Sequence, residues 1–153
     1  MTALDTNLLG TVHGGVVMKL VDEVAGAVAQ RHSGGSAVTA AMDEMDFLEP
    51  VRVGDLVHAH AQVNWAGQTS MEVGVQVLSE PWNEAGVPRA RVATAYLVYV
   101  AVDADGRPRV VPPVLPETDE DRRRFAEAGI RRTHRLARRE AIRASRRADA
   151  AVT

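Results

Sequence analysis

The start of the chain combines a polar, glycine-rich loop with a carboxylate about two helical turns further on. The loop contains Asn7, His13, Gly14 and Gly15, and Asp22 lies in the apolar segment that follows. A helix that begins near Gly14 directs unpaired N–H groups and the positive end of its dipole at whatever lies before it. Such a helix end can polarise a carbonyl group, and a nearby carboxylate can act as a general base or as a nucleophile.

Asp22 can be oriented in two ways on this helix. At about 3.6 residues per turn, it shares a face with small and apolar residues, namely Gly15, Met18, Ala25, Gly26 and Ala29. That orientation is unusual, because burying a charge without a partner is costly. The alternative leaves Asp22 exposed and buries a stripe made of Val17, Leu20, Val21 and Val24. The helical period alone favours neither orientation.

Composition limits the class of protein. The 153 residues are enough for one domain with a substantial core. The chain has no cysteine and five scattered histidines, so disulfides, thiol chemistry and a metal site are not expected. His58 and His60 point the same way from one predicted strand, but such a pair is more often packed or exposed. No apolar run approaches the roughly 20 residues of a membrane span and no signal segment opens the chain, so we expect a cytoplasmic protein.

After the first helix, the period of the sequence changes from helical to alternating. Strands are predicted over residues 37–48, 55–65, 69–78 and 89–102, separated by polar or glycine-containing turns. The pattern therefore predicts one helix, then four antiparallel strands, then a C-terminal helix. It shows no internal repeat and no linker.

Charge is distributed unevenly along the chain. Residues 1–116 carry 7 basic and 13 acidic side chains, whereas residues 117–153 carry 11 basic and 7 acidic ones. Arginine-rich ends can indicate nucleic-acid binding. Here acids are interleaved with the arginines and aromatic stacking residues are lacking, so a solvated helix is favoured and nucleic acid is not expected as a partner.

The last segment has the pattern of a helix. Acidic residues occupy its first turn and arginines its later turns, as the helix dipole favours. The predicted helix covers about 119–147 and is capped by Thr118 or Asp119. A break at Gly129 is compatible with the pattern, and the end is expected to fray from Ala144.

Four segments of the sequence form a recognisable set. They are the Asn-x-x-Gly-x-x-His-Gly-Gly loop that starts at Asn7, the helix Met18–Gly26, the strand end Met45–Asp55 and the segment Leu115–Phe125. Together, and in this order, they resemble the hotdog-fold acyl-CoA thioesterases, specifically the cytosolic acyl-CoA hydrolase family. The four segments span most of the chain.

The resemblance implies an α+β hotdog fold, in which an antiparallel sheet wraps around a central helix, with a C-terminal helix in addition. Residues 1–116 would form the acyl-CoA thioesterase domain and residues 117–153 a charged helical extension that lies over the oligomer surface. The family normally has a strand before the Asn7 loop. Only Met1–Leu4 remain for it, so this strand is short or the start codon lies upstream.

The resemblance also implies hydrolysis of acyl-CoA to free fatty acid and CoA, with no cofactor because CoA is part of the substrate. The Gly14 N–H would be the oxyanion donor, Asp22 the general base or the nucleophile, and Asn7 would fix the water or the sulfur side. In related thioesterases the Asn and the Asp meet across a subunit interface. The chain is therefore expected to form at least a homodimer, with a hexamer built as a trimer of dimers as a further option.

Other residues are weaker candidates for contacting the substrate. They are His13 and Gly15 in the loop, the strand hydroxyls Thr39 and Ser70, and the strand-end arginines Arg89 and Arg91. The hydroxyls are placed to line a pantetheine channel, and the arginines to meet the CoA phosphates. Each residue also has a structural interpretation, as a turn residue, a prop for the loop or a solvated charge. Asn7 itself has the pattern of a turn residue.

Two further expectations concern the helix of Asp22 and the acyl chain. Glu23 lies about 100° away from it on the helix and is expected to pair with Lys19. Apolar side chains such as Met18, Met42 and Met45 indicate an adaptable lining for the acyl chain.

Two other functions fit a hotdog domain. One is a non-catalytic acyl-CoA-binding regulator, which has no use for the base that Asp22 would provide. The other is a hydratase or dehydratase, which pairs an Asp with a His in an Asp-x-x-x-x-His pattern that is absent from this helix entry. A thioesterase is therefore the favoured prediction.

Overall fold

The computed structural model describes residues 5–83 and 86–150 of the chain. The short strand expected at Met1–Leu4 lies outside the described residues. The chain divides into two compact units, the first ending at Val114 and the second beginning at Leu115. Each unit is described below by itself.

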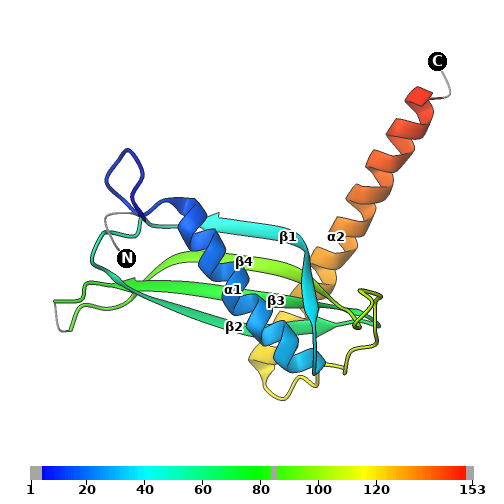
Figure 1. Ribbon diagram of the computed structural model, residues 1–153, viewed down its shortest axis with the longest axis horizontal. Coiled ribbons are helices and arrows are strands. Elements are labelled where there is room, and N and C mark those ends of the chain that lie inside the picture. Colours follow the sequence, from blue (N-terminus) through cyan, green and yellow to red (C-terminus); the bar gives the residue numbers. More distant parts are fainter. Residues whose placement is uncertain (1–4, 84–85, 151–153) are drawn as a thin grey trace. The chain divides into compact units, whose positions relative to one another are not determined.

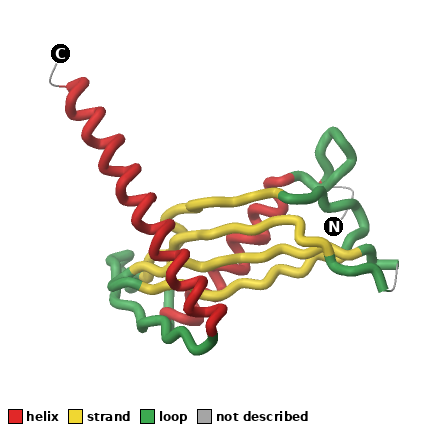
Figure 2. Tube along the Cα trace, turned by 180° about the vertical axis from the view of Figure 1, so that it is seen from behind, coloured by secondary structure: helices red, strands yellow, loops and turns green. Residues whose placement is uncertain are grey.

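The first unit is one helix packed on one antiparallel sheet. Helix α1 (Gly14–Ser33) is followed by β1 (Ala37–Phe47), β2 (Leu56–Ala66), β3 (Ser70–Glu80) and β4 (Ala90–Ala101). The strands lie in the order β1-β4-β3-β2, so β3 and β4 are central and β1 and β2 form the edges. Helix α1 crosses one face of this sheet (Figure 1), and the opposite face is seen in Figure 2. The predicted order of one helix and four antiparallel strands is confirmed.

Both ends of α1 are specified by residues around it. His13 is the N-cap, and its ring Nδ1 accepts a hydrogen bond from the Gly15 N–H. The helix ends at Gly34, which has a φ of 69° and donates its N–H to the Gln30 carbonyl. This left-handed conformation favours glycine, because it has no Cβ to clash with the backbone.

The buried stripe of α1 resolves the orientation of Asp22. It consists of Val17, Val21, Ala25, Ala29 and Ser33. Asp22 itself is exposed within the described chain. Of the two orientations that the sequence left open, the exposed one is observed, although Ala25 and Ala29 of the other stripe are buried as well. In the alternative stripe, Val17 and Val21 are buried, whereas Leu20 and Val24 are only half buried. The buried stripe continues through Ala25 and Ala29 instead.

The core lies between α1 and the sheet. Alternate residues of the central strands face the helix, because successive side chains of a strand point to opposite faces. On β4 these are Ala93, Ala95, Leu97, Tyr99 and Ala101, all at most 1% exposed. The register aligns Thr39 of β1 with Tyr99 of β4. The fold therefore places two hydroxyl side chains next to each other on neighbouring strands under the helix.

The second unit contains α2 (Asp119–Ala150). Thr118 and Asp121 form a capping box, since the Thr118 hydroxyl accepts from the Asp121 N–H at 3.1 Å and an Asp121 carboxylate oxygen accepts from the Thr118 N–H at 3.1 Å. Thr118, one of the two predicted caps, is thus the residue that fulfils this role. The helix has no break at Gly129, and it continues past Ala144, where fraying was expected. A glycine inside a helix is tolerated when the neighbouring turns are well formed.

No helix in the described part of the chain combines the length and the apolar character needed to span a membrane.

Candidate functional site

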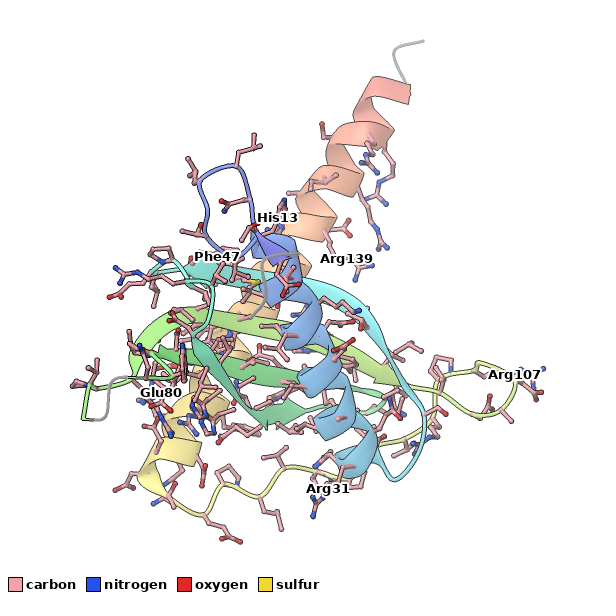
Figure 3. All side chains as sticks on the ribbon, turned by 60° about the vertical axis from the view of Figure 1, so that its left-hand side comes forward. His13, Arg31, Phe47, Glu80, Arg107 and Arg139 are labelled. Carbon is pink, nitrogen blue, oxygen red and sulfur yellow. The ribbon has the colours of Figure 1, made fainter. Side chains whose placement is uncertain are left out.

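The N-terminal end of α1 presents a backbone donor. The Gly15 N–H is bound by His13 at 3.0 Å, and the Val16 N–H is bound by the His13 carbonyl at 2.9 Å. The Gly14 N–H has no hydrogen-bond partner among the described residues. Figure 3 shows His13 at this end of α1, near Phe47, and Arg31 toward the other end. The helix therefore begins with one N–H group that is available to a ligand.

A pocket of about 350 Å³ opens at this helix end. It is lined by Asn7, Val12, Gly14, Val17, Phe47, Leu48, Glu49, Pro50, Val51 and Val92. A Cβ placed on Gly14 would lie 3.3 Å from Cζ of Phe47, which is tighter than an ordinary contact. Glycine at this position therefore lets the Phe47 ring approach the start of the helix. Most lining residues are apolar, and Asn7, Glu49 and the Gly14 backbone are the polar groups.

Asn7 holds the loop that precedes the helix. Its Oδ1 accepts from the Leu9 N–H at 2.8 Å and from the Thr11 N–H at 3.3 Å. Its Nδ2 donates to the Thr11 hydroxyl at 2.8 Å. This network agrees with the structural interpretation of Asn7 as a turn residue. An amide nitrogen carries two protons, so one Nδ2 proton stays available in addition to the Thr11 bond.

The carboxylate of Asp22 is held by two hydroxyl groups. Thr39 donates to Oδ1 at 2.7 Å, and the Tyr99 hydroxyl lies 2.8 Å from the same oxygen. The Tyr99 hydroxyl also lies 2.9 Å from the backbone carbonyl of Asp22. Among the described residues, nothing donates a hydrogen bond to Oδ2. One oxygen of the carboxylate is therefore anchored and the other is available.

Burial raises the pKa of Tyr99 to about 12. The hydrogen bond from Thr39 acts in the opposite direction, whereas the hydrogen bond to Asp22 and the charge of Asp22 add to the increase. Tyr99 therefore keeps its proton at neutral pH and acts toward Asp22 as a donor.

A second pocket, of about 520 Å³, surrounds this carboxylate. It is lined by Asp22, Glu23, Gly26, Ala27, Gln30, Ala37, Val38, Thr39 and Tyr99. Asn7 and Gly14 line the first pocket and Asp22 lines the second, so the first unit does not bring the three predicted catalytic residues into one pocket.

Glu23 and Lys19 form the predicted ion pair at 3.7 Å, with both side chains largely exposed. Met18, Met42 and Met45 line neither of the two pockets of a single chain, so their contact with an acyl chain stays a prediction. Met42 and Met45 are half buried against the core, and Met18 is 41% exposed.

The other predicted substrate contacts are dispersed. Gly15 has its N–H capped by His13, as described above. Ser70 begins β3 one residue before the buried Met71, so its side chain points to the sheet face away from α1. Arg89 pairs with Glu80 at 3.0 Å. Arg91 lies 2.8 Å from the Gln76 side chain when the oxygen of that amide faces it. None of these four residues lines either pocket.

A charged cluster occupies the end of the sheet where β2 begins and β3 ends. Glu80 accepts from His58 at 2.8 Å and from Arg89 at 3.0 Å. The Arg89 hydrogen bond, followed by the His58 hydrogen bond, lowers the pKa of Glu80. Across the described ranges 5–83 and 86–150, no group of three or more His, Asp or Glu side chains is placed to hold a metal ion.

Sequence reasoning missed Tyr99 and Phe47. Tyr99 alternates with the apolar residues that face the helix, so the strand pattern did not set it apart from them. A buried tyrosine hydroxyl usually needs a hydrogen-bond partner, and this requirement was the signal that a polar group lies opposite. Phe47 ends β1, and nothing in the sequence indicates that its ring meets Gly14.

Comparison with known proteins identifies the family. The profile of the thioesterase superfamily matches residues 9–85. The cytosolic acyl coenzyme A thioester hydrolase of Mus musculus is 40% identical over 123 residues, which are 80% of this chain and 32% of that protein. The chain thus spans about a third of the length of this curated relative.

Solved structures agree with the fold. An apo-hexameric acyl-CoA thioesterase superposes with a TM-score of 0.85 at 38% identity, covering 90% of this chain and 87% of that one. The acyl-CoA hydrolase of Staphylococcus aureus, in complex with butyryl coenzyme A, coenzyme A and coenzyme A disulfide, gives 0.86 at 36% identity, with 95% and 87% covered. Structures of that hydrolase also exist for variants in which an aspartate, an asparagine or a threonine is replaced with alanine. The predicted hotdog fold is confirmed, and the chain belongs to the thioesterase superfamily.

Proposed function

We propose that this protein is an acyl-CoA thioesterase that hydrolyses acyl-CoA to a free fatty acid and CoA. The observation that carries the proposal is the Asp22 carboxylate, which lines a pocket with one oxygen anchored and the other available. The names of the mouse relative and of the solved structures support acyl-CoA as the substrate. The reaction needs no cofactor in this proposal, because CoA is part of the substrate.

The proposed chemistry begins with polarisation of the thioester carbonyl. The Gly14 N–H, which is unpartnered among the described residues, donates to the developing oxyanion with support from the dipole of α1. Loss of such a donor typically reduces the rate by about 100- to 1000-fold. The pocket beside Gly14 is mostly apolar, which suits the acyl portion of a substrate.

Asp22 then acts in one of two ways. As a general base, it removes a proton from water, the water oxygen bonds to the carbonyl carbon, and the C–S bond breaks as the thiolate takes up a proton. As a nucleophile, a carboxylate oxygen bonds to the carbonyl carbon, the C–S bond breaks, and CoA leaves as a thiolate that takes a proton from water; water then hydrolyses the resulting anhydride to the fatty acid and the free Asp22 carboxylate. In both routes the reacting oxygen is Oδ2, because Oδ1 is occupied by two hydroxyl groups.

The complete site is proposed to form between two subunits. Asn7 and Asp22 line different pockets of one chain, so a second copy is needed to bring an asparagine loop to each carboxylate. The hexameric assembly of a similar thioesterase supports self-association, at least to a dimer and as far as a trimer of dimers. Within each subunit, we propose that residues 1–116 form the thioesterase domain and residues 117–153 an extension.

The alanine variants of the Staphylococcus aureus hydrolase support the choice of residues. The asparagine and the aspartate replaced in that protein are 15 positions apart, and the threonine is 17 positions further on. Asn7, Asp22 and Thr39 have these same separations. The coincidence favours Asn7, Asp22 and Thr39 as parts of one site.

The decisive experiment measures thiol release from acyl-CoA substrates of increasing chain length. Asp22→Asn should lower kcat by about 100- to 10,000-fold, the usual range for loss of a general base. Glu23→Gln is the matched control, because this neighbouring carboxylate is exposed and pairs with Lys19, and it should keep most of the activity. CoA binding without hydrolysis in the parent protein would instead identify a non-catalytic regulator.

The shared site has its own test. Asn7→Ala and Asp22→Asn proteins, each inactive alone, should recover about a quarter of the parent activity when they are co-refolded in equal amounts. A mixed dimer contains one site with both residues intact, and random pairing makes about half of the dimers mixed. If mixing restores no activity while both variants dimerise normally, the two residues act within one subunit.

A further inference from the structure

The carboxylate of Asp22 is hydrogen-bonded to a side chain that belongs to the core of the protein. Tyr99 lies on the central strand β4 and is 1% exposed. Its ring packs under α1 beside Gly26, where a Cβ would lie 3.6 Å from the tyrosine hydroxyl. The position of this hydroxyl is therefore fixed by the sheet and by the packing of the helix on it.

The hydroxyl of Tyr99 contacts both the backbone and the side chain of the same residue. It lies 2.9 Å from the Asp22 carbonyl oxygen and 2.8 Å from Oδ1. These two contacts fix the direction in which the aspartate side chain leaves the helix. Thr39, an exposed residue on the edge strand β1, contributes the second hydrogen bond to Oδ1 at 2.7 Å.

The side chains that carry the two hydroxyl groups differ in how freely they can move. Thr39 is on the sheet edge and exposed, whereas Tyr99 is buried and has no room to rotate its ring away. Both bond to Oδ1, so Oδ2 is the oxygen left without a donor among the described residues, on a side chain that lines the 520 Å³ pocket. A carboxylate without the Tyr99 bond could rotate about its terminal torsion, which has broad, two-fold preferences.

We propose that Tyr99 is a positioning residue that holds the Asp22 carboxylate so that Oδ2 points into the pocket, an inference that rests on the proposed thioesterase function. Tyr99 does not contact the reacting atoms in this role. It acts through Asp22, and Thr39 assists it from the neighbouring strand. The raised pKa of Tyr99 is consistent with this role, because the hydroxyl stays protonated.

The test uses the full chain with Tyr99→Phe, which removes the hydroxyl and keeps the buried ring. We expect kcat to fall about 10- to 100-fold, the size expected for loss of a hydrogen bond to a charged group, with KM for acyl-CoA nearly unchanged. Tyr96→Phe is the matched control, because Tyr96 lies on the same strand but points to the opposite face. It should leave both parameters unchanged.

A structural role for Tyr99 would give a different result. Loss of folded protein would lower the apparent activity in proportion to the folded fraction and would lower the thermal midpoint. In the Asp22→Asn background, Tyr99→Phe should cause no further loss in single-turnover rate, because the residue through which it acts is already disabled. An additional 10-fold or larger loss in that background would overturn the proposal.

A readout independent of activity completes the test. In a crystal structure of the Tyr99→Phe protein, we expect the Asp22 carboxylate to occupy more than one orientation. A carboxylate in the parental orientation, or a full kcat in the variant, would refute the positioning role while leaving the thioesterase function intact. Absence of acyl-CoA hydrolysis in the parent protein would instead refute the function, and the crystal structure would still decide whether Tyr99 orients Asp22.

Discussion

At the scale of single residues, Tyr99 is the clearest case in which burial alters a titration. Its pKa is raised from 10.0 to about 12, mainly because removal from water disfavours the tyrosinate. The negative charge of Asp22 acts in the same direction. The hydroxyl that bonds to Asp22 therefore also makes the stability of the fold depend on pH.

The consequence is an alkaline loss of stability. A group with a higher pKa in the folded state stabilises the fold fully below its unfolded pKa, and this contribution is lost as pH rises through the folded pKa. For Tyr99 the window runs from 10.0 to about 12. We expect urea unfolding to show the parent protein losing stability across this window relative to Tyr99→Phe.

Spectroscopic titration checks the same prediction. The chain has two tyrosines, so the ultraviolet titration of tyrosinate is simple. A step near the raised pKa should be present in the parent protein and missing from Tyr99→Phe. The prediction fails if the variant and the parent lose stability in parallel over the whole window.

At the scale of elements, the Glu80 cluster joins three strands at one end of the sheet. His58 comes from β2, Glu80 ends β3, and Arg89 directly precedes β4. Figure 3 shows Glu80 among the side chains at this end of the sheet. His58 binds Oε1 of Glu80 and Arg89 binds Oε2. The strand-end arginine Arg89 is therefore paired with a carboxylate.

The lowered pKa of Glu80 predicts an acid-dependent contribution to stability. A carboxylate with a lower pKa in the folded state stabilises the fold above its unfolded value of 4.5, and the contribution is lost as pH falls through the lowered pKa. Glu80→Gln should therefore be less stable than the parent at neutral pH. This difference should shrink as the pH is lowered below 4.5.

Denaturant unfolding over a range of acid pH measures this difference. Glu49→Gln, a change in an exposed loop carboxylate, controls for the loss of one negative charge. A stability difference for Glu80→Gln that stays constant from neutral to acid pH would mean that the hydrogen bonds of Glu80 do not favour its charged form.

At the scale of the whole molecule, the two units differ in composition and charge. The first contains the core, both pockets and the proposed site, whereas the helix of the second is arginine-rich. Its first turns hold ion pairs such as Arg122 with Asp119 and Arg123 with Glu120. Exposed pairs of this kind contribute on the order of 0–1 kcal/mol each. We therefore propose that the extension affects assembly rather than chemistry.

Truncation after Gly129 tests this role. The shortened protein should retain substantial thioesterase activity, while its higher-order assembly becomes weaker and more sensitive to salt, since screening weakens charge pairs between subunits. Light scattering at several salt concentrations measures the assembly. A full-length protein with Arg138, Arg139, Arg143 and Arg146 replaced by glutamine separates the effect of charge from that of length. Loss of activity with intact dimers would place the extension at the active site.

The sequence by itself determined the order of elements, because each strand and helix has a local period and local end signals. Alternation predicted the four strands to within a few residues, and Thr118 supplied an end signal that depends only on its neighbours. The family followed from four short segments in a fixed order. The ion pair of Glu23 with Lys19 was also predictable, since it joins residues one turn apart.

The tertiary structure decided the surroundings of Asp22. Tyr99 is 77 residues away and Thr39 is 17 residues away, and the pairing of β1 with β4 under α1 brings both to one carboxylate oxygen. Neither the rotation of α1 on the sheet nor the register of two distant strands is encoded in a local period. Both result from packing of the whole core, which is why the sequence indicated Asp22 but gave no reason to single out Tyr99.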